Sequence, residues 1–329
     1  MRRPAAARTS LAVLAVLGLL LSACSPQPEG PAGNPTEGIN VVASTNVYGD
    51  IAKMVGGDKV SVTAIINKTS QDPHSYEATA QDRLAVSKAD LVVENGGGYD
   101  DFLHTLVEDS SIEARNVLNA VELSGLAHPE DEATGEAAPA GSAAADDHAH
   151  DHGEFNEHVW YSLAAMGKLA DDLAARLGGL EPGSAATFTA NAGAFKSELD
   201  ELAGKLGALK TAAAGGKVAV TEPVPLYLLA DAGLENSTPE DYIAAVEEGS
   251  DVPPAVLKAA TDLISSKSVR FLAYNGQTEG PQTEALRKAA ETAGVPVVDF
   301  SETLPEGKTY LQWMTDNVNN VSKVLETNR

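Results

Sequence analysis

The sequence predicts an α/β protein of two lobes, each with a mainly parallel sheet flanked by helices, joined by a long rigid backbone helix. Short β-branched runs alternate with helical segments from Ile39 to about Leu118, and the same alternation resumes at Lys217. Strands separated by helices are typical of βαβ units, in which the strands run parallel. Between the two alternations, residues 161–214 carry apolar residues at helical intervals, which predicts the connection between the lobes.

The composition supports packed cores and narrows the class of partner. Hydrophobic residues make up 43% of the 329 residues, and this length suggests two domains. The 47 acidic and 23 basic side chains give a formal net charge of −24, and no basic stripe interrupts the acidity. Because such a chain repels phosphate backbones, nucleic acid is a poor partner, and cations are better candidates.

The first residues resemble a bacterial lipoprotein signal. Three arginines precede an apolar run from Leu11 to Leu21, which is short for a bilayer-spanning helix but suits a signal-peptide core. Small residues then precede Cys24, the only cysteine, as in a lipobox where cleavage falls before the lipidated thiol. We expect a signal peptide over 1–23, a lipid on Cys24 and a flexible Pro- and Gly-rich tether over 24–38. The alternative is a short membrane anchor with an incidental cysteine.

The N-terminal lobe is expected over 39–160 and includes an acidic segment. We expect its strands at 39–44, 60–66 and 91–95 and a helix over roughly 79–89. Residues 127–157 are rich in Ala, Gly and acidic residues and offer no apolar face, which predicts a surface loop. Clustered imidazoles bind zinc readily, so the loop is a candidate auxiliary metal site; the alternative is a solvated linker without a metal role. Its three closely spaced histidines are His148, His150 and His152.

The connecting region 161–214 and the C-terminal lobe 215–329 follow. The connecting region has an apolar face broken once, at Glu181-Pro182-Gly183, and it ends at Gly215-Gly216. The face consists of Leu163, Met166, Leu169, Leu173 and Leu177 before the break and Phe195, Leu199, Leu202, Leu206 and Leu209 after it. In the C-terminal lobe we expect strands at 217–221, 270–274 and 295–300 and a final helix over about 309–326.

Three polar motifs fall where strands meet helices, which is where open α/β sheets bind ligands. They are Asp72-Pro73-His74-Ser75-Tyr76-Glu77, Asn156-Glu157-His158-Val159-Trp160 and Thr221-Glu222-Pro223. Each also has a structural interpretation: a loop histidine can be merely solvated, Trp160 fits a core, and Glu222 is favoured before a helix that begins at Pro223.

Taken together, these motifs make the chain from about Ile39 to the C-terminus resemble the substrate-binding lipoproteins of zinc and manganese ABC importers. DPHSYEATAQDRLAVSKADLVVENGGGYDDFL looks like the family's first-ligand motif, its helix and its next strand, and NEHVW looks like the second-ligand motif. VAVTEPVPLYLLADAGL is similar to the third-ligand segment, with Glu222 on the ligand position and Tyr227 on the family's tyrosine. The resemblance implies that His74, His158 and Glu222 are metal ligands.

The fourth ligand position departs from the family's pattern, in which an aspartate usually follows the last strand. In VVDFSETLPEGKTY the order of the motif favours Glu302, and Asp299 is the alternative. The segment AYNGQTEGP also differs from the acidic motif of many relatives, which leaves Glu279 as a candidate contact behind the ligands.

The resemblance implies a receptor without enzymatic activity, lipid-anchored on the extracytoplasmic face of the cell membrane. It would act as a monomer, hold Zn²⁺ or Mn²⁺ between its lobes and deliver the ion to an ABC permease and its ATPase. Two imidazoles with one or two carboxylates suit either ion. The carboxylates favour manganese and the histidine-rich loop favours zinc, which is the first choice. The alternatives are a surface adhesin and a zinc-dependent hydrolase, although the sequence contains no HExxH motif.

Overall fold

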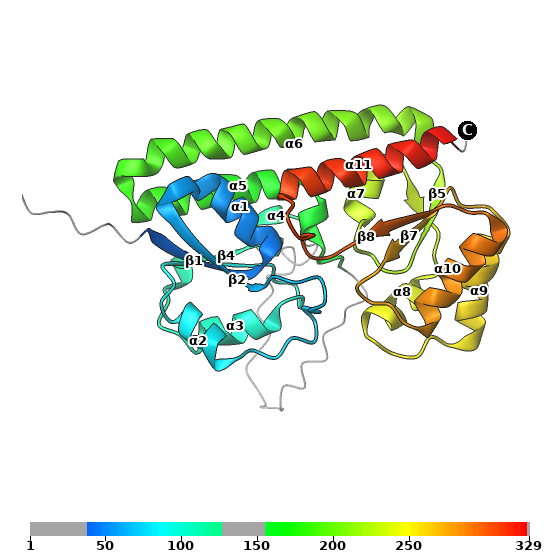
Figure 1. Ribbon diagram of the computed structural model, residues 1–329, viewed down its shortest axis with the longest axis horizontal. Coiled ribbons are helices and arrows are strands. Elements are labelled where there is room, and N and C mark those ends of the chain that lie inside the picture. The colour runs from blue at the N-terminus through cyan, green and yellow to red at the C-terminus, as the bar shows by residue number, and fades with distance from the viewer. Residues whose placement is uncertain (1–37, 127–154, 328–329) are drawn as a thin grey trace, which may run out of the picture. The chain divides into compact units, whose positions relative to one another are not determined.

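The computed structural model describes residues 38–126 and 155–327, whose eight strands form two four-stranded parallel sheets (Figure 1). The strand order is β2-β1-β3-β4 in the first sheet and β6-β5-β7-β8 in the second. The expected α/β class, with parallel sheets flanked by helices and a long helix, is confirmed. The signal peptide, the tether, Cys24 and the histidines at 148, 150 and 152 lie outside the described residues.

The first lobe follows the alternation that the sequence predicts. The sequence pattern missed only its last strand, which is three residues long and too short to show a two-residue period. Thr79 begins the second helix with a capping box, since it accepts from the Asp82 backbone N–H and its own N–H donates to the Asp82 carboxylate. The strands are β1 (Ile39–Thr45), β2 (Val60–Ile66), β3 (Leu91–Glu94) and β4 (Val117–Asn119), and the helices are α1 (Asn46–Gly56), α2 (Ala80–Val86), α3 (Asp101–Glu108) and α4 (Ala120–Ser124).

The second lobe differs from the prediction at the start of one helix and in a two-residue strand, Glu235–Asn236, that the sequence pattern missed. The helix after the first strand of this lobe does not begin at Pro223. Val224 precedes Pro225, and helical backbone geometry is disfavoured for the residue before a proline. Residues 223–225 instead form a turn, and the helix begins at Leu226. The strands are β5 (Lys217–Val220), β6 (Glu235–Asn236), β7 (Leu272–Asn275) and β8 (Val297–Phe300), and the helices are α7 (Leu226–Asp231), α8 (Glu240–Glu247), α9 (Pro254–Ser265), α10 (Pro281–Ala293) and α11 (Tyr310–Thr327).

The connecting region consists of two helices, α5 (Leu163–Leu180) and α6 (Ala185–Ala213), which are separated by a short 3₁₀ turn at Pro182–Ser184. The 29 residues of α6 span roughly 43 Å at 1.5 Å per residue. This helix packs against α1 of the first lobe and against α7 and α11 of the second (Figure 1). The domain boundaries at 160 and 215 stay predictions.

One apolar core extends from the first sheet through α5 and α6 to α11. The predicted apolar face of the connecting region is buried in it, with Leu209 partly buried at its end. Because both lobes pack against the same helices, a wide hinge motion would open this core, and a small rigid-body closure is favoured.

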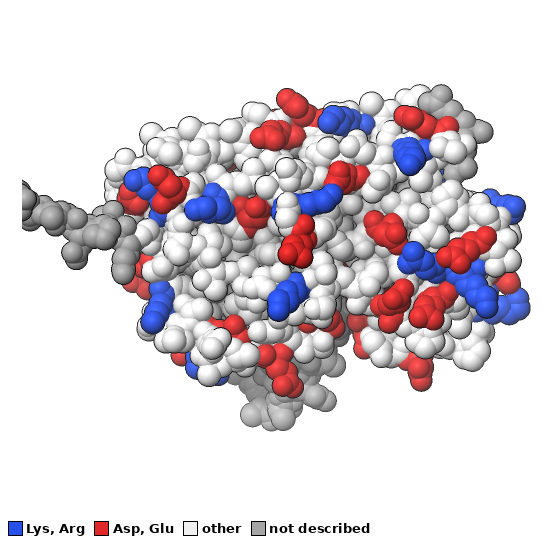
Figure 2. Space-filling model, viewed as in Figure 1, with Lys and Arg blue, Asp and Glu red and all other residues white. Residues whose placement is uncertain are grey.

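The described surface is mixed in charge. On the face drawn in Figure 2, Lys and Arg side chains are scattered among Asp and Glu side chains. Within residues 38–126 and 155–327, no helix has both the length and the apolar character that a bilayer span requires.

Candidate metal centre

Four of the predicted site residues line one cavity of about 430 Å³. His74 lies in the loop after β2, His158 lies just before α5, Glu222 follows β5 and Glu302 follows β8. In a parallel sheet the carboxyl ends of the strands share one edge, which brings Glu222 and Glu302 together at the second sheet, and His74 joins them from the end of β2 in the first. None of the described residues that line the cavity is Lys or Arg.

His158 is held in a defined orientation by its neighbour in sequence. Its Nδ1 lies 2.8 Å from Asn156 Oδ1, and its backbone N–H donates to the same oxygen. Because this amide oxygen can only accept, Nδ1 carries the proton and Nε2 is left as the ligand atom. The ring is 2% exposed and packs against Trp160. Burial lowers the pKa of His158, and the nearby His74 lowers it further, so its imidazole is neutral, as metal binding requires.

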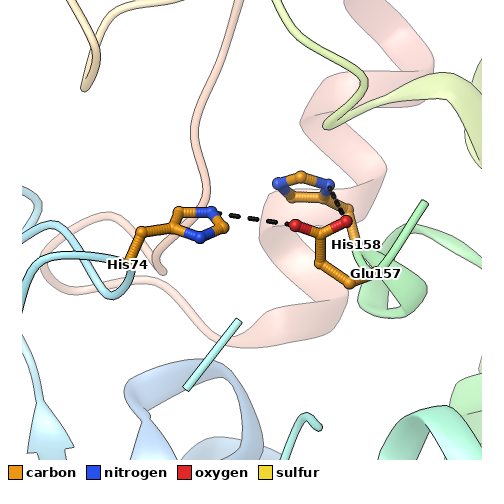
Figure 3. A group of neighbouring side chains, drawn as sticks. All are labelled: His74, Glu157 and His158. Carbon is orange, nitrogen blue, oxygen red and sulfur yellow. Dashed lines mark ion pairs between the residues drawn. The ribbon is translucent and has the colours of Figure 1, made fainter. Parts of the chain in front are cut away.

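His74 is presented from a loop that Asp72 stabilises. The Asp72 carboxylate accepts from the His74 backbone N–H at 3.0 Å and from the Ser75 hydroxyl at 2.8 Å. The His74 ring meets Tyr99 edge to face, and its centroid lies 6.2 Å from that of His158. Figure 3 shows the two imidazoles on either side of a glutamate, Glu157.

Glu222 and Glu302 are joined by one amide. Asn275, at the end of β7, donates through Nδ2 to both carboxylates, at 2.6 Å in the case of Glu302. Thr278 donates to the same oxygen of Glu222 as Asn275 does, and the Tyr99 hydroxyl donates to the other oxygen of Glu302. These bonds fix two carboxylates that are only 5% and 2% exposed.

The loop that carries Glu302 is itself anchored by Gln277. The Gln277 side-chain oxygen accepts from the backbone N–H groups of Glu302 and Thr303, at 2.6 and 3.0 Å. Its amide nitrogen donates across the cleft to the Thr69 carbonyl at 2.9 Å. The loop position of Glu302 therefore depends on a contact with the first lobe.

The alternative fourth ligand, Asp299, lies away from this cavity. Asp299 is an exposed residue on β8 and forms an ion pair with Arg287 at 3.4 Å. Side chains alternate along a strand, and Asp299 lies on the exposed side of β8, whereas Glu302 lies beyond the end of the strand. Glu279 does line the cavity and accepts from the Tyr274 hydroxyl at 3.1 Å.

Two further glutamates belong to this region and were not predicted. Glu157 is 2% exposed, and its oxygens lie 3.9 Å from His74 Nε2 and 3.9 Å from His158 Nδ1 (Figure 3). Glu247, in the last turn of α8, lines the cavity from the second lobe. The only sequence signal for Glu157 is its place beside His158, and the sequence contains no signal for Glu247. A local pattern does not show how far either side chain is buried.

The buried carboxyl groups make the cavity electrostatically suited to a cation. Burial raises the pKa of all four glutamates, and repulsion by neighbouring carboxylates adds to the effect. A divalent ion would supply the positive charge that the lining residues lack. Two neutral imidazoles with several carboxylates form the mixed nitrogen and oxygen donor set that zinc and manganese accept.

Known proteins of similar sequence and structure include metal-binding lipoproteins. The chain is 29% identical over 196 residues to the manganese-binding lipoprotein MntA of Halalkalibacterium halodurans, a match that spans 58% of this chain and 55% of that protein. It is 24% identical over 328 residues to the manganese ABC transporter substrate-binding lipoprotein scaA of Streptococcus gordonii, which covers 96% of this chain and 97% of that protein. The chain thus spans about half the length of the first relative and nearly all of the second.

A solved structure has the same fold. The protein FpvC from Pseudomonas aeruginosa in complex with Mn²⁺ matches with a TM-score of 0.67 and 23% sequence identity, covering 89% of this chain and 100% of that chain. The family model described as zinc-uptake complex component A, periplasmic, matches residues 41–324, which include both sheets and the connecting helices. The resemblance found in the ligand motifs is confirmed, and the chain belongs to this zinc-uptake component family, ZnuA.

Proposed function

We propose that this protein is an extracytoplasmic, lipid-anchored receptor that binds one divalent transition-metal ion between its lobes and delivers it to an ABC importer. The observation that carries the proposal is the convergence of two histidines and two glutamates on one cavity whose described lining residues include no Lys or Arg. The ligands are His74, His158, Glu222 and Glu302. Family membership and the names of the relatives support the transport role.

The hydrogen bonds of Glu222 favour zinc over manganese as the cargo. Asn275 and Thr278 both donate to its Oε2 atom, so Oε1 is the oxygen left for the ion. A carboxylate that binds the ion through only one of its oxygens favours a low coordination number, and zinc prefers four ligands. Manganese tolerates more oxygen ligands and remains the second choice, in agreement with the manganese-binding names of two relatives.

Membrane attachment and partners complete the proposal. The lipid is placed on Cys24, after cleavage of residues 1–23, by the lipobox resemblance. The partners are an ABC permease and its ATPase, as expected for a substrate-binding lipoprotein. The small closure favoured by the shared core would present the loaded lobes to the permease.

Metal analysis tests this function. Protein purified without added metal is expected to carry up to one equivalent of a divalent transition metal. After stripping, it should take up zinc in preference to manganese when both are supplied through a metal buffer. Failure to bind either ion with a dissociation constant below about 1 μM, a free energy of about −8 kcal/mol, would contradict the proposed function.

Asn156 gives a more local prediction. Besides fixing the His158 ring, its Nδ2 donates to the Pro223 carbonyl at 3.1 Å and its carbonyl accepts from the Tyr227 hydroxyl at 2.6 Å. It therefore ties the His158 ring to the loop that carries Glu222. Asn156→Ala is expected to weaken zinc binding by about 10- to 100-fold, the usual effect of losing a residue that orients a ligand.

Zinc competition assays and ¹⁵N NMR of the imidazoles check this prediction. In the NMR spectrum of the variant, the His158 ring should no longer be held in the single tautomer that is protonated at Nδ1. Asn191→Ala is the matched control, because Asn191 donates one hydrogen bond between α6 and α1, away from the cavity. Equal affinities of the two variants would show that Asn156 does not act through His158.

A further inference from the structure

Two glutamates beside the cleft, the buried Glu157 and the half-buried Glu247, each have a side-chain oxygen without a donor in the described part of the chain. Glu157 comes from the segment before α5, and Glu247 comes from α8 of the second lobe. The Glu157 carboxylate lies 3.9 Å from His74 Nε2, and Glu247 lines two cavities together with His74. The Oε1 atom of each is buried and has no hydrogen-bond partner in the described part of the chain. Carboxylate oxygens only accept, so each of these two buried atoms requires a proton or a cation.

No basic side chain balances this pair. The ion pairs of Glu157 within the described residues are with His74 and His158, and neither glutamate pairs with a described Lys or Arg. His74, Glu157 and His158 offer ligand atoms that all lie within 4.8 Å of one another. Because uncompensated buried carboxylates are costly, a bound cation explains the arrangement better than isolated charges do.

The pair lies on the more open side of the site. His74 is the most exposed of the four proposed ligands, with a side chain 24% exposed against 2% for His158. Glu247 lines the main cavity and also two adjoining cavities, of about 250 and 430 Å³. Glu247 thus stands where these cavities meet, next to the imidazole that an incoming ion would reach first.

We propose that Glu157, Glu247 and His74 form a second subsite for a divalent transition-metal ion, which the cargo occupies as it enters and leaves the buried site. Two carboxylates and one imidazole suit this class of ion, and the open positions would be filled by water. His74 belongs to both sets of ligands. It can therefore stay bound to the ion while the carboxylate ligands change as the ion moves inward. The inference rests on the proposed function of the main site.

Rapid-mixing kinetics test the subsite. The full-length protein, stripped of metal, is mixed with Zn²⁺ to measure capture and, when loaded, with a chelator to measure release. A subsite on the route lowers the barrier in both directions, so Glu247→Gln is expected to slow capture and release by a similar factor, about tenfold. Glu201→Gln, on an exposed position of α6 outside these cavities, removes the same charge and is the matched control.

A second variant guards against a folding defect. Glu157→Gln should slow the same two rates, and the double variant should be no slower than either single variant, because both changes remove one subsite. Unchanged rates in both variants would overturn the subsite and leave protonation as the account of the two unpartnered oxygens. Faster release with unchanged capture would also overturn it, since that pattern marks a ligand of the main ion. Loss of zinc binding in His74→Ala/His158→Ala is measured in parallel, so failure of the main site is recognised separately.

Discussion

Replacing His74 and His158 together by alanine is expected to abolish tight binding of both zinc and manganese. The two imidazoles are the nitrogen ligands of the proposed site, and their removal leaves the carboxylates as its remaining ligands. Affinity should fall by more than about 100-fold, the upper range for losing a residue that merely orients a ligand. Titration calorimetry on the stripped full-length protein measures the effect.

His104 provides the control for this double variant. It is a histidine on α3 whose side chain is 60% exposed, and it lies near Glu94 and Glu108 rather than in the cavity. His104→Ala should bind both metals as the unmodified protein does. Unchanged affinity in the double variant would show that the ion is held elsewhere.

The metal-free protein is expected to lose stability as the pH rises from about 6.5 to 8.5. Burial raises the pKa of Glu157, Glu222, Glu247 and Glu302, so in this range the folded chain holds protons that the unfolded chain has released. The free energy of unfolding therefore decreases with pH, and the contribution of each group is lost as the pH passes through its raised pKa. Below about 6.5 the buried His158, whose pKa is lowered, acts in the opposite direction, which sets the lower limit of the range.

Melting temperatures of metal-free and zinc-loaded protein at several pH values check this prediction. The bound ion replaces the protons, so the loaded protein should not show the decline, and the difference between the two melting temperatures should widen with pH. Glu302→Gln removes one of the buried acids and should flatten the decline of the metal-free protein. A metal-free melting temperature that stays level or rises from pH 6.5 to 8.5 would refute the expectation.

The fold was largely predictable because the local spacing of apolar residues indicates most of its strands and helices. The β-branched runs at 60–66 and 91–94 became strands, and the apolar face from Leu163 to Leu177 became a buried helix face. The missed strands, β4 and β6, have only three and two residues, which is too few to establish a period. The start of α7 depends on two nearby prolines, and Pro225 keeps the helix from beginning at Pro223 as predicted.

The site was predictable to the extent that strand ends converge. His74, His158 and Glu222 each follow or border a predicted element, so their meeting between the carboxyl-end edges of the two sheets could be expected. The preference for Glu302 over Asp299 came from the family's motif order, and strand alternation gives its physical reason. Glu157 and Glu247 could not be found, because their burial arises from packing between segments about 90 residues apart.

Anomalous diffraction from crystals of the full-length chain loaded with one equivalent of zinc tests the central claim most directly. The account predicts one dominant peak, at about 2.0–2.2 Å from a nitrogen of His74, a nitrogen of His158 and an oxygen of each of Glu222 and Glu302. A dominant ion bound outside this cavity, or one that lacks both histidines as ligands, would contradict it.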